Sequence, residues 1–210
     1  GFDAFILKFD NTQTRLWATY YGGVGDENFN SEKTVTVDDC QSVYVAINTY
    51  SPVMPTKQSC AAGHYFDNSY NGGREVFLSK FSNGGVQQWG TYFGGNGDDF
   101  RQAIDVDNAG NLFVGGEWTE ENFVTIIPST YPLANPGGSA LYDASFNGPT
   151  TSDDGFIAKF KPTTINSNAS ATPAVCTCNG TATANGTGGC SPYQYVWYNS
   201  AWAQIGNTQT

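Results

Sequence analysis

One block of sequence occurs three times in this chain, and this recurrence limits the possible fold more than any other feature. The run AFILKF at residues 4–9 returns as VFLSKF at residues 76–81 and as GFIAKF at residues 155–160. A second run, WATYYGG at residues 17–23, returns as WGTYFGG at residues 89–95. Successive copies of the first run lie 72 and 79 residues apart, and the blocks keep their order. Such regularity predicts a fold made of repeated structural units.

Each unit contains four short runs of β-branched and aromatic residues, separated by glycine, asparagine and aspartate turns. This pattern is typical of strands and not of helices. Phe5, Leu7 and Phe9 share one face of the first run, while Ile6 and Lys8 lie on the other. Because both faces are largely apolar, we expect each strand to lie between two sheets. A four-stranded sheet that packs on copies of itself is a β-propeller blade, so we predict an all-β fold.

The matched blocks resemble the SBBP repeats, a bacterial β-propeller repeat family found in large secreted and surface proteins. The resemblance covers residues 1–162 and departs from the repeat in two long segments, residues 50–69 and 119–145. It implies an arc of about two to three four-stranded blades of a larger ring. The last blade has no fourth strand after residue 160, so we expect a strand from upstream in a longer chain to complete it.

A second module is expected after the repeats. Residues 163–173 are small and polar and lie between prolines, as in a linker. Residues 174–210 contain three cysteines and no charged side chain. They resemble the start of the repeat domain in gliding-motility surface adhesins, which implies a truncated Ig-like (PKD-like) β-sandwich.

The charge balance excludes two classes of partner. The chain carries 19 acidic and 9 basic residues, for a formal net charge of −10. Nucleic acids and anionic membrane surfaces bind through Lys/Arg patches, so neither is expected as the main partner. The apolar runs are only a few residues long, far short of the roughly 20 needed to cross a bilayer, so we expect no direct membrane insertion.

The cysteines predict an oxidising compartment. Cys40 and Cys60 both lack a counterpart in the next copy of the repeat, which predicts that they pair with each other. Such a disulfide contributes on the order of 3 kcal/mol. A second candidate joins Cys190 to either Cys178 or Cys176. The alternative, a metal site, is disfavoured because Cys-x-Cys with one histidine is poor zinc spacing. Disulfides indicate an extracellular location.

Acidic residues occur in pairs where one repeat meets the next, at Asp26-Glu27 and Asp98-Asp99. Their functional interpretation is binding of a hard cation, with calcium as the one cofactor that the sequence suggests. The alternative is turn chemistry, in which aspartate accepts hydrogen bonds from backbone amides. The Gly-Gly-x-Gly runs that precede both pairs favour turns.

No catalytic residue is assigned. His64 is the only histidine, and no Gly-x-Ser-x-Gly nucleophile motif accompanies it. The abundance of carboxylates keeps one enzymatic alternative open, a secreted propeller hydrolase or lyase acting on glycans through two acidic groups.

The two long segments carry the candidate binding residues. Both join the second strand of a unit to its third, so they should leave from the same face of the ring. Binding residues concentrate on loops held by a rigid scaffold, and aromatic rings suit sugar faces and protein contacts. We select Trp118, Phe123 and Tyr131 as candidate ligand-binding residues, because other aromatics in these segments recur in both copies and are better explained by packing.

Together these features predict a non-enzymatic segment of a large bacterial cell-surface protein that acts as a binding and adhesion scaffold. The expected partners are glycans, other surface proteins and the remainder of its own longer chain. The resemblance to adhesins further implies surface attachment or gliding and export through the type IX route.

Overall fold

The computed structural model contains strands as its only regular elements among the residues that it describes. Those residues are 1–28, 33–59, 64–119, 131–144, 153–161, 166–172, 181–187, 194–199 and 201–209. The chain forms two compact units, Gly1–Ser59 with Tyr65–Pro162, and Cys60–His64 with Thr163–Thr210. Within the described ranges, no helix is long and apolar enough to span a membrane. The all-β prediction is confirmed.

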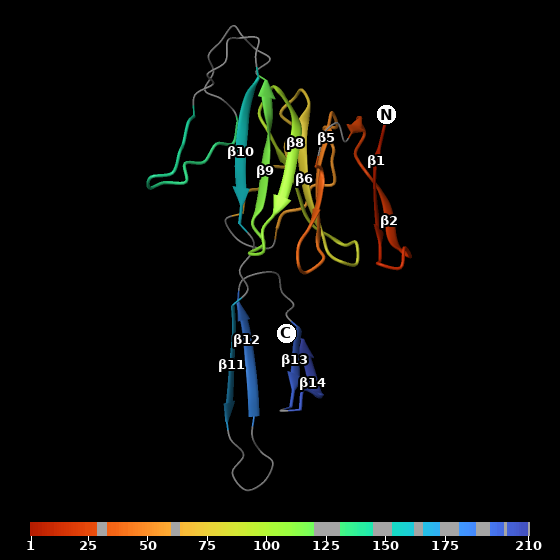
Figure 1. The fold of residues 1–210 in the computed structure, drawn as a ribbon, viewed down its shortest axis with the longest axis vertical. Helices are drawn as coiled ribbons and strands as arrows, with labels where there is room; N and C mark the ends of the chain where they lie inside the picture. The colour runs from red at the N-terminus through yellow and green to blue at the C-terminus, as the bar shows by residue number, and fades with distance from the viewer. Residues whose placement is uncertain are drawn as a thin grey trace. The chain divides into compact units, whose positions relative to one another are not determined.

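The first unit contains three antiparallel sheets, which follow one another along the chain (Figure 1). Sheet A consists of β1 (Ala4–Phe9) and β2 (Arg15–Tyr21). Sheet B consists of β3 (Glu27–Asn28), β4 (Val35–Val37), β5 (Val43–Thr49), β6 (Glu75–Phe81) and β7 (Gln87–Phe93). Sheet C consists of β8 (Asp98–Val106), β9 (Leu112–Thr119) and β10 (Asp154–Phe160).

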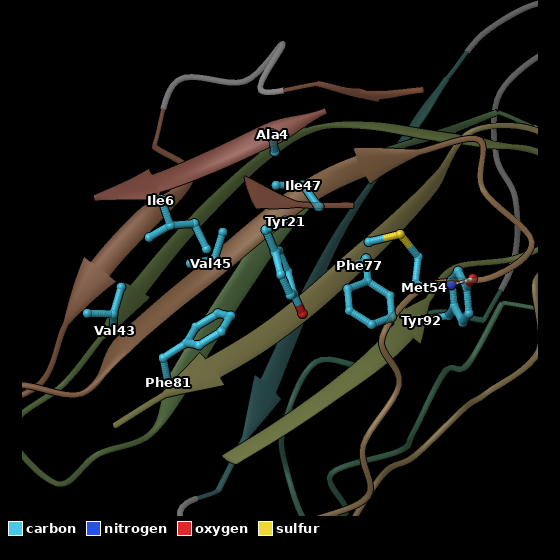
Figure 2. Packing of buried hydrophobic residues seen from close by; sticks show 10 residues of the cluster. All are labelled: Ala4, Ile6, Tyr21, Val43, Val45, Ile47, Met54, Phe77, Phe81 and Tyr92. Carbon is cyan, nitrogen blue, oxygen red and sulfur yellow. Dashed lines mark hydrogen bonds between the residues drawn. The ribbon is translucent and has the colours of Figure 1, made fainter. Parts of the chain in front are cut away.

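Two apolar layers hold the three sheets together. The first layer fills the space between sheets A and B, and Figure 2 shows ten of its side chains. Its members are Ala4, Ile6, Tyr21, Val43, Val45, Ile47, Met54, Phe77, Phe81 and Tyr92. The second layer joins sheets B and C through Tyr44, Ala46, Val76, Leu78, Phe93, Ile104, Leu112, Val114, Trp118 and Tyr131. Sheet B is therefore buried on both faces, as the apolar character of both strand faces predicts.

Matched positions of sheets A and B differ sharply in exposure. Phe77 of β6 is 0 % exposed, whereas its counterpart Phe5 of β1 is 60 % exposed. Tyr92 of β7 is 0 % exposed, whereas its counterpart Tyr20 of β2 is 80 % exposed. All four side chains lie on the same face of their sheets, because Phe5 pairs with Tyr20 as Phe77 pairs with Tyr92. Sheet A covers this face of sheet B, and no described sheet covers it in sheet A.

Matched positions on the opposite face differ in the same way between sheets B and C. Leu78 of β6 is 0 % exposed because sheet C packs on it. Its counterpart in β10, Ile157, is 88 % exposed. In the stack formed by sheets A, B and C, the outer faces of sheets A and C thus carry the same kinds of apolar side chain that form the two inner layers.

The first long segment returns along sheet B after β5 ends. Lys57 forms an antiparallel bridge with Gly90 of β7, with both backbone N–H···O distances at 2.9 Å. Further along, Tyr92 donates its backbone N–H to the Asp67 carbonyl, and the Asp67 N–H donates to Thr91 Oγ1. The segment therefore covers the outer edge of β7, which would otherwise present unpaired backbone groups.

The second unit contains two antiparallel hairpins. One consists of β11 (Asn166–Thr172) and β12 (Thr181–Thr187), the other of β13 (Gln194–Tyr198) and β14 (Gln204–Gln209). The backbone N–H of Gly186 donates to the Tyr195 hydroxyl at 2.6 Å and links the hairpins. Three of these strands lie within residues 174–210 and agree with a β module there, whereas β11 lies within residues 163–173, which the sequence predicts to be a linker. The Ig-like assignment of residues 174–210 stays a prediction.

Candidate functional site

The first acid of each predicted pair binds the backbone of the preceding sheet. Asp98 Oδ1 accepts the N–H of Arg74 at 2.5 Å, and the Asp99 N–H donates to the Arg74 carbonyl at 2.6 Å. In the previous copy, Asp26 Oδ1 accepts the N–H of Phe2 at 2.8 Å. Arg74 directly precedes β6 and Phe2 lies two residues before β1, so each bond joins the start of one of these matched strands to the acidic pair that opens the next sheet. These hydrogen bonds agree with the turn interpretation.

The second acid of each pair folds back onto the glycine turn. Glu27 Oε2 accepts the Gly23 N–H at 3.1 Å, and Asp99 Oδ2 accepts the Gly95 N–H at 3.2 Å. Both carboxyl groups are buried. Each contact needs the glycine that comes just before, Gly22 or Gly94. A Cβ at Gly22 would lie 2.2 Å from Glu27 Oε2, and a Cβ at Gly94 would lie 1.9 Å from Asp99 Oδ2.

The two copies differ in the residue that lies opposite the second acid and in whether that residue donates a hydrogen bond to it. Thr49 lies opposite Glu27 in the β3–β5 pair and donates its hydroxyl to Glu27 Oε1 at 2.8 Å. Trp118 takes the corresponding place opposite Asp99 in the β8–β9 pair. Asp99 Oδ1 is consequently buried without a hydrogen-bond partner among the described residues.

A third acid, Glu75, lies beside Asp99. The Glu75 Cγ and the Asp99 Oδ2 lie 3.0 and 1.9 Å from the point that a Cβ of Gly94 would occupy. Glu75 Oε2 accepts the backbone N–H of Asn71 at 3.0 Å, and its Oε1 accepts Asn71 Nδ2 at 3.0 Å. Neither Glu75 nor Asp99 forms an ion pair within the described part of the chain. Two buried carboxyl groups thus share one turn without a neutralising cation from the protein.

This environment favours the protonated acids. Burial raises the pKa of Asp99 to about 8, and the neighbouring Glu75 charge adds to this shift. Burial likewise raises the pKa of Glu75 to about 7, against the hydrogen bonds from Asn71. Protons therefore neutralise this pair near neutral pH, and a bound cation is the competing means of doing so.

Two of the three selected aromatic residues lie next to this pair. The rings of Trp118 and Tyr131 are 5.3 Å apart between centroids, and Tyr131 lies 5.0 Å from Phe156. Burial raises the pKa of Tyr131, and the charge of Asp99 raises it further. Both rings are buried and belong to the layer between sheets B and C. Their place in the structure is a packing position, and their role in ligand binding stays a prediction.

The remaining predicted site residues are only partly described. Phe123 lies outside the described residues, as do Cys60, Cys176, Cys178 and Cys190. Cys40 is exposed in the turn between β4 and β5. Because the partners in both predicted disulfides lie outside the described residues, these disulfides stay predictions. Within the described ranges, no three or more His, Cys, Asp or Glu side chains are grouped so that they could hold a metal ion. Calcium binding likewise stays a prediction.

Sequence reasoning missed Glu75. A signal for it was present, because acidic residues occupy the same position before the apolar run in all three copies, at Asp3, Glu75 and Asp154. Asp3 also lies near the acid of its own turn, since its Oδ1 is 3.3 Å from the point that a Cβ of Gly22 would occupy. The carboxyl pair is therefore a repeated feature of the fold.

Comparison with known families identifies one repeat. Residues 88–123 match the SBBP family, which is described as a beta-propeller repeat. This match runs from β7 through the acidic turn and β8 into the segment after β9. No curated protein matches the chain. The SBBP resemblance is confirmed for this stretch.

The carboxyl pair predicts a stability that falls as the pH rises. In the unfolded chain the two acids lose their protons near 3.8 and 4.5, whereas in the folded protein they keep them to about pH 8 and 7. Between these limits the folded protein holds more protons, so its free energy of unfolding decreases with pH. Each carboxyl contributes a slope of up to about 1.4 kcal/mol per pH unit.

Urea unfolding between pH 5.5 and 8.5 measures this slope. The Asp99→Asn variant removes the titration of the Asp99 carboxyl but keeps a side-chain oxygen that can accept the Gly95 N–H. We therefore expect its free energy of unfolding to depend less on pH than that of the parent protein, and to exceed it at pH 8.5. The exposed Asp39→Asn variant is the control and should follow the parent protein. Equal slopes for the parent and Asp99→Asn would contradict the prediction.

Proposed function

We propose that this chain is part of a secreted bacterial cell-surface protein and acts as a binding and adhesion scaffold for glycans, in surface attachment or gliding. In this proposal the stacked sheets form an arc of a larger β-propeller, and a segment displayed at one end of the sheets contacts the ligand. One observation carries the proposal: an exposed segment with apolar side chains follows Tyr131, which is packed in the layer between sheets B and C.

The two long segments leave from corresponding points of sheets B and C. One follows Thr49, which pairs with Glu27, and the other follows Thr119, next to Trp118, which pairs with Asp99. Both points are therefore at the end of the sheets where the acidic turns lie. A rigid base with segments at one end is the usual arrangement of a binding scaffold.

The two long segments differ in how much of each is anchored to the sheets. The first is anchored along β7, with Met54 in the core and its backbone N–H bonded to the Tyr92 hydroxyl at 3.0 Å. The second is anchored by the buried Tyr131, beyond which every residue of 133–144 is exposed. We call residues 133–144 the exposed arm. It presents Leu133, Leu141 and Tyr142, and exposed apolar groups of this kind are typical of interaction sites. Tyr142 is one of the recurring aromatic residues for which the sequence favours a packing role, but its side chain is exposed.

The outer faces of the stack support the arc. Phe5 and Tyr20 at one end and Ile157 at the other occupy positions that are fully buried in sheet B. Further sheets of the same kind would bury them in the way that sheets A and C bury sheet B. The remainder of a longer chain is the partner that we propose for both faces.

A binding assay on immobilised polysaccharides tests the function. The purified chain is applied to chitin, cellulose, xylan and mucin surfaces, and bound protein and released soluble sugar are both measured. We expect binding without release of sugar. The Leu141→Ser/Tyr142→Ser variant should bind about tenfold more weakly, since anchors of this size contribute more than 1 kcal/mol.

The Tyr20→Ser variant is the matched control, because Tyr20 is exposed on a stacking face and not on the arm. Equal loss of binding in both variants would contradict a role of the arm. Binding to none of the four surfaces would overturn the glycan proposal and leave surface proteins as the partner to test. Release of soluble sugar would instead support a hydrolase or lyase.

A further inference from the structure

The turn between β13 and β14 holds a tryptophan in a backbone conformation that suits glycine. The φ angle of Trp202 is +58°, in the left-handed region. Bulky residues rarely adopt this region, because their Cβ crowds the backbone. The Trp202 side chain is 82 % exposed, so burial of the ring does not offset this cost. Residues kept in an unfavourable conformation without a packing reason are candidates for a functional role.

Four other turns of the chain share this geometry and show what the position requires. In each turn the first residue donates its N–H to the carbonyl of the fifth, and the fourth donates its N–H to the carbonyl of the first. The side-chain oxygen of the first residue accepts the N–H of the fifth. The first residues are Asp10, Asp38, Ser82, Asp107 and Asn199, and the fourth residues, all with positive φ, are Gln13, Gln41, Gly85, Gly110 and Trp202. Glycine or glutamine thus suffices for this turn, and its formation does not require tryptophan.

Trp202 lies beside a second exposed ring on the same hairpin. The ring centroids of Tyr198 and Trp202 are 6.1 Å apart, and the Tyr198 side chain is exposed. Tyr198 pairs with Gln204, and Val196 pairs with Asn207, so these four side chains share one face of the hairpin. All four are exposed. We call this surface, together with Trp202, the hairpin face.

The other face of the hairpin is the one that packs on the protein. Tyr195 and Trp197 alternate with Val196 and Tyr198 and are partly buried. The Tyr195 hydroxyl accepts the backbone N–H of Gly186 in β12, which directs this side toward the neighbouring hairpin. The hairpin face therefore carries aromatic rings and amide side chains on the side turned away from this contact.

The charge distribution of the chain indicates what kind of ligand suits this face. Every acidic, basic or histidine side chain precedes Pro162, and residues 162–210 contain none. Acidic polysaccharides and other anions are bound through arginine and lysine, which this segment does not offer. Tyrosine and tryptophan combine an apolar ring with a polar group, and amides both donate and accept hydrogen bonds. These groups match the apolar ring faces and the hydroxyl groups of uncharged sugars.

We propose that the hairpin face binds an uncharged polysaccharide chain. Trp202 and Tyr198 stack on sugar rings, and Gln204 and Asn207 form hydrogen bonds with sugar hydroxyl groups. The turn holds the Trp202 ring at the end of the hairpin, where a long polymer can reach it. This site belongs to the second compact unit and adds to the proposed function without depending on the exposed arm.

Binding of the full chain to cellulose and chitin, which are uncharged, and to alginate, which is anionic, tests the proposal. We expect Trp202→Gly to bind the two uncharged polymers about tenfold more weakly, because it removes one of the stacking rings. Its midpoint of thermal unfolding should not fall, since glycine adopts a positive φ without steric cost. Trp202→Phe keeps a ring and should stay within about threefold of the parent affinity.

Gln13→Gly is the matched control, because it makes the same change at the same turn position between β1 and β2, and it should leave binding unchanged. Each variant is also made in the Leu141→Ser/Tyr142→Ser background, where binding by the exposed arm is removed. Weaker binding of Trp202→Gly in that background supports the hairpin face as a separate site.

Unchanged binding of Trp202→Gly in both backgrounds would overturn the proposal and leave glycan binding by the exposed arm intact. Weaker binding together with a lower unfolding midpoint would overturn it as well, because the tryptophan would then have a structural role. Equal affinity for alginate and cellulose would contradict an uncharged ligand. A dimer in sedimentation that Trp202→Gly converts to a monomer would assign the face to a second copy of the chain instead.

Discussion

Replacing Phe77 by alanine lowers the free energy of unfolding by about 3–5 kcal/mol, the usual cost of removing a fully buried phenylalanine. The ring is 0 % exposed and lies in the layer between sheets A and B. It contacts the rings of Tyr21 and Tyr92 at 6.2 and 5.0 Å between centroids. The change leaves a cavity between two sheets that cannot close without moving one of them. Urea unfolding followed by tryptophan fluorescence measures the loss.

Phe5→Ala is the matched control, because Phe5 holds the same place in the previous copy of the repeat. Its ring is exposed, so its removal should cost less than about 1 kcal/mol. A similar loss in both variants would contradict the stacking of sheet A on sheet B. Phe5→Ala would become costly only in a protein where a further sheet covers this face.

Gly94→Ala is expected to destabilise the protein by about 3 kcal/mol, at the upper end of the range for overpacked positions. The added Cβ would lie 1.9 Å from Asp99 Oδ2 and 3.0 Å from Glu75 Cγ. The Asp99 carboxyl would have to move, which breaks its bond with the Gly95 N–H and leaves a buried polar group unsatisfied. Thermal unfolding at pH 6, where the pair is largely protonated, measures this effect.

The control for this variant is Gly84→Ala in the β6–β7 turn. A Cβ there would meet only Ser82 Oγ, at 3.9 Å, and the change should alter the stability little. A Gly94→Ala protein as stable as Gly84→Ala would show that the acidic turn is loosely packed, against the structure described above.

The repeat determined most of what could be predicted from the sequence. Alternation along residues 5–9 places Phe5 and Ile6 on opposite faces, and the structure buries Ile6 against sheet B while Phe5 faces outward. Matched blocks also imply matched registers, and Lys8–Trp17 and Lys80–Trp89 pair alike. Local patterns suffice here because strand periodicity determines which side chains share a sheet face, and strands with the same repeated sequence pair in the same register.

The inserted segments and the acidic turns were harder to predict. Tyr131 packs on Trp118 and Phe156, which are far from it along the chain, and no periodicity marks such a contact. Glu75 meets Asp99 across the turn between two sheets, so neither residue signals the other locally. The role of an acid therefore depends on which backbone N–H groups the fold brings to it, and composition alone does not supply that information.

Hydroxyl-radical footprinting of the 210-residue chain, read out by mass spectrometry, tests the stacked-repeat account most directly. It compares the solvent exposure of side chains at matched repeat positions within one molecule. The account predicts fast oxidation of Phe5, Tyr20 and Ile157, slow oxidation of Phe77, Tyr92 and Leu78, and equal rates within each matched aromatic pair in denaturant. Fast oxidation of Phe77 and Tyr92 in the folded protein, at the rates of Phe5 and Tyr20, would contradict it.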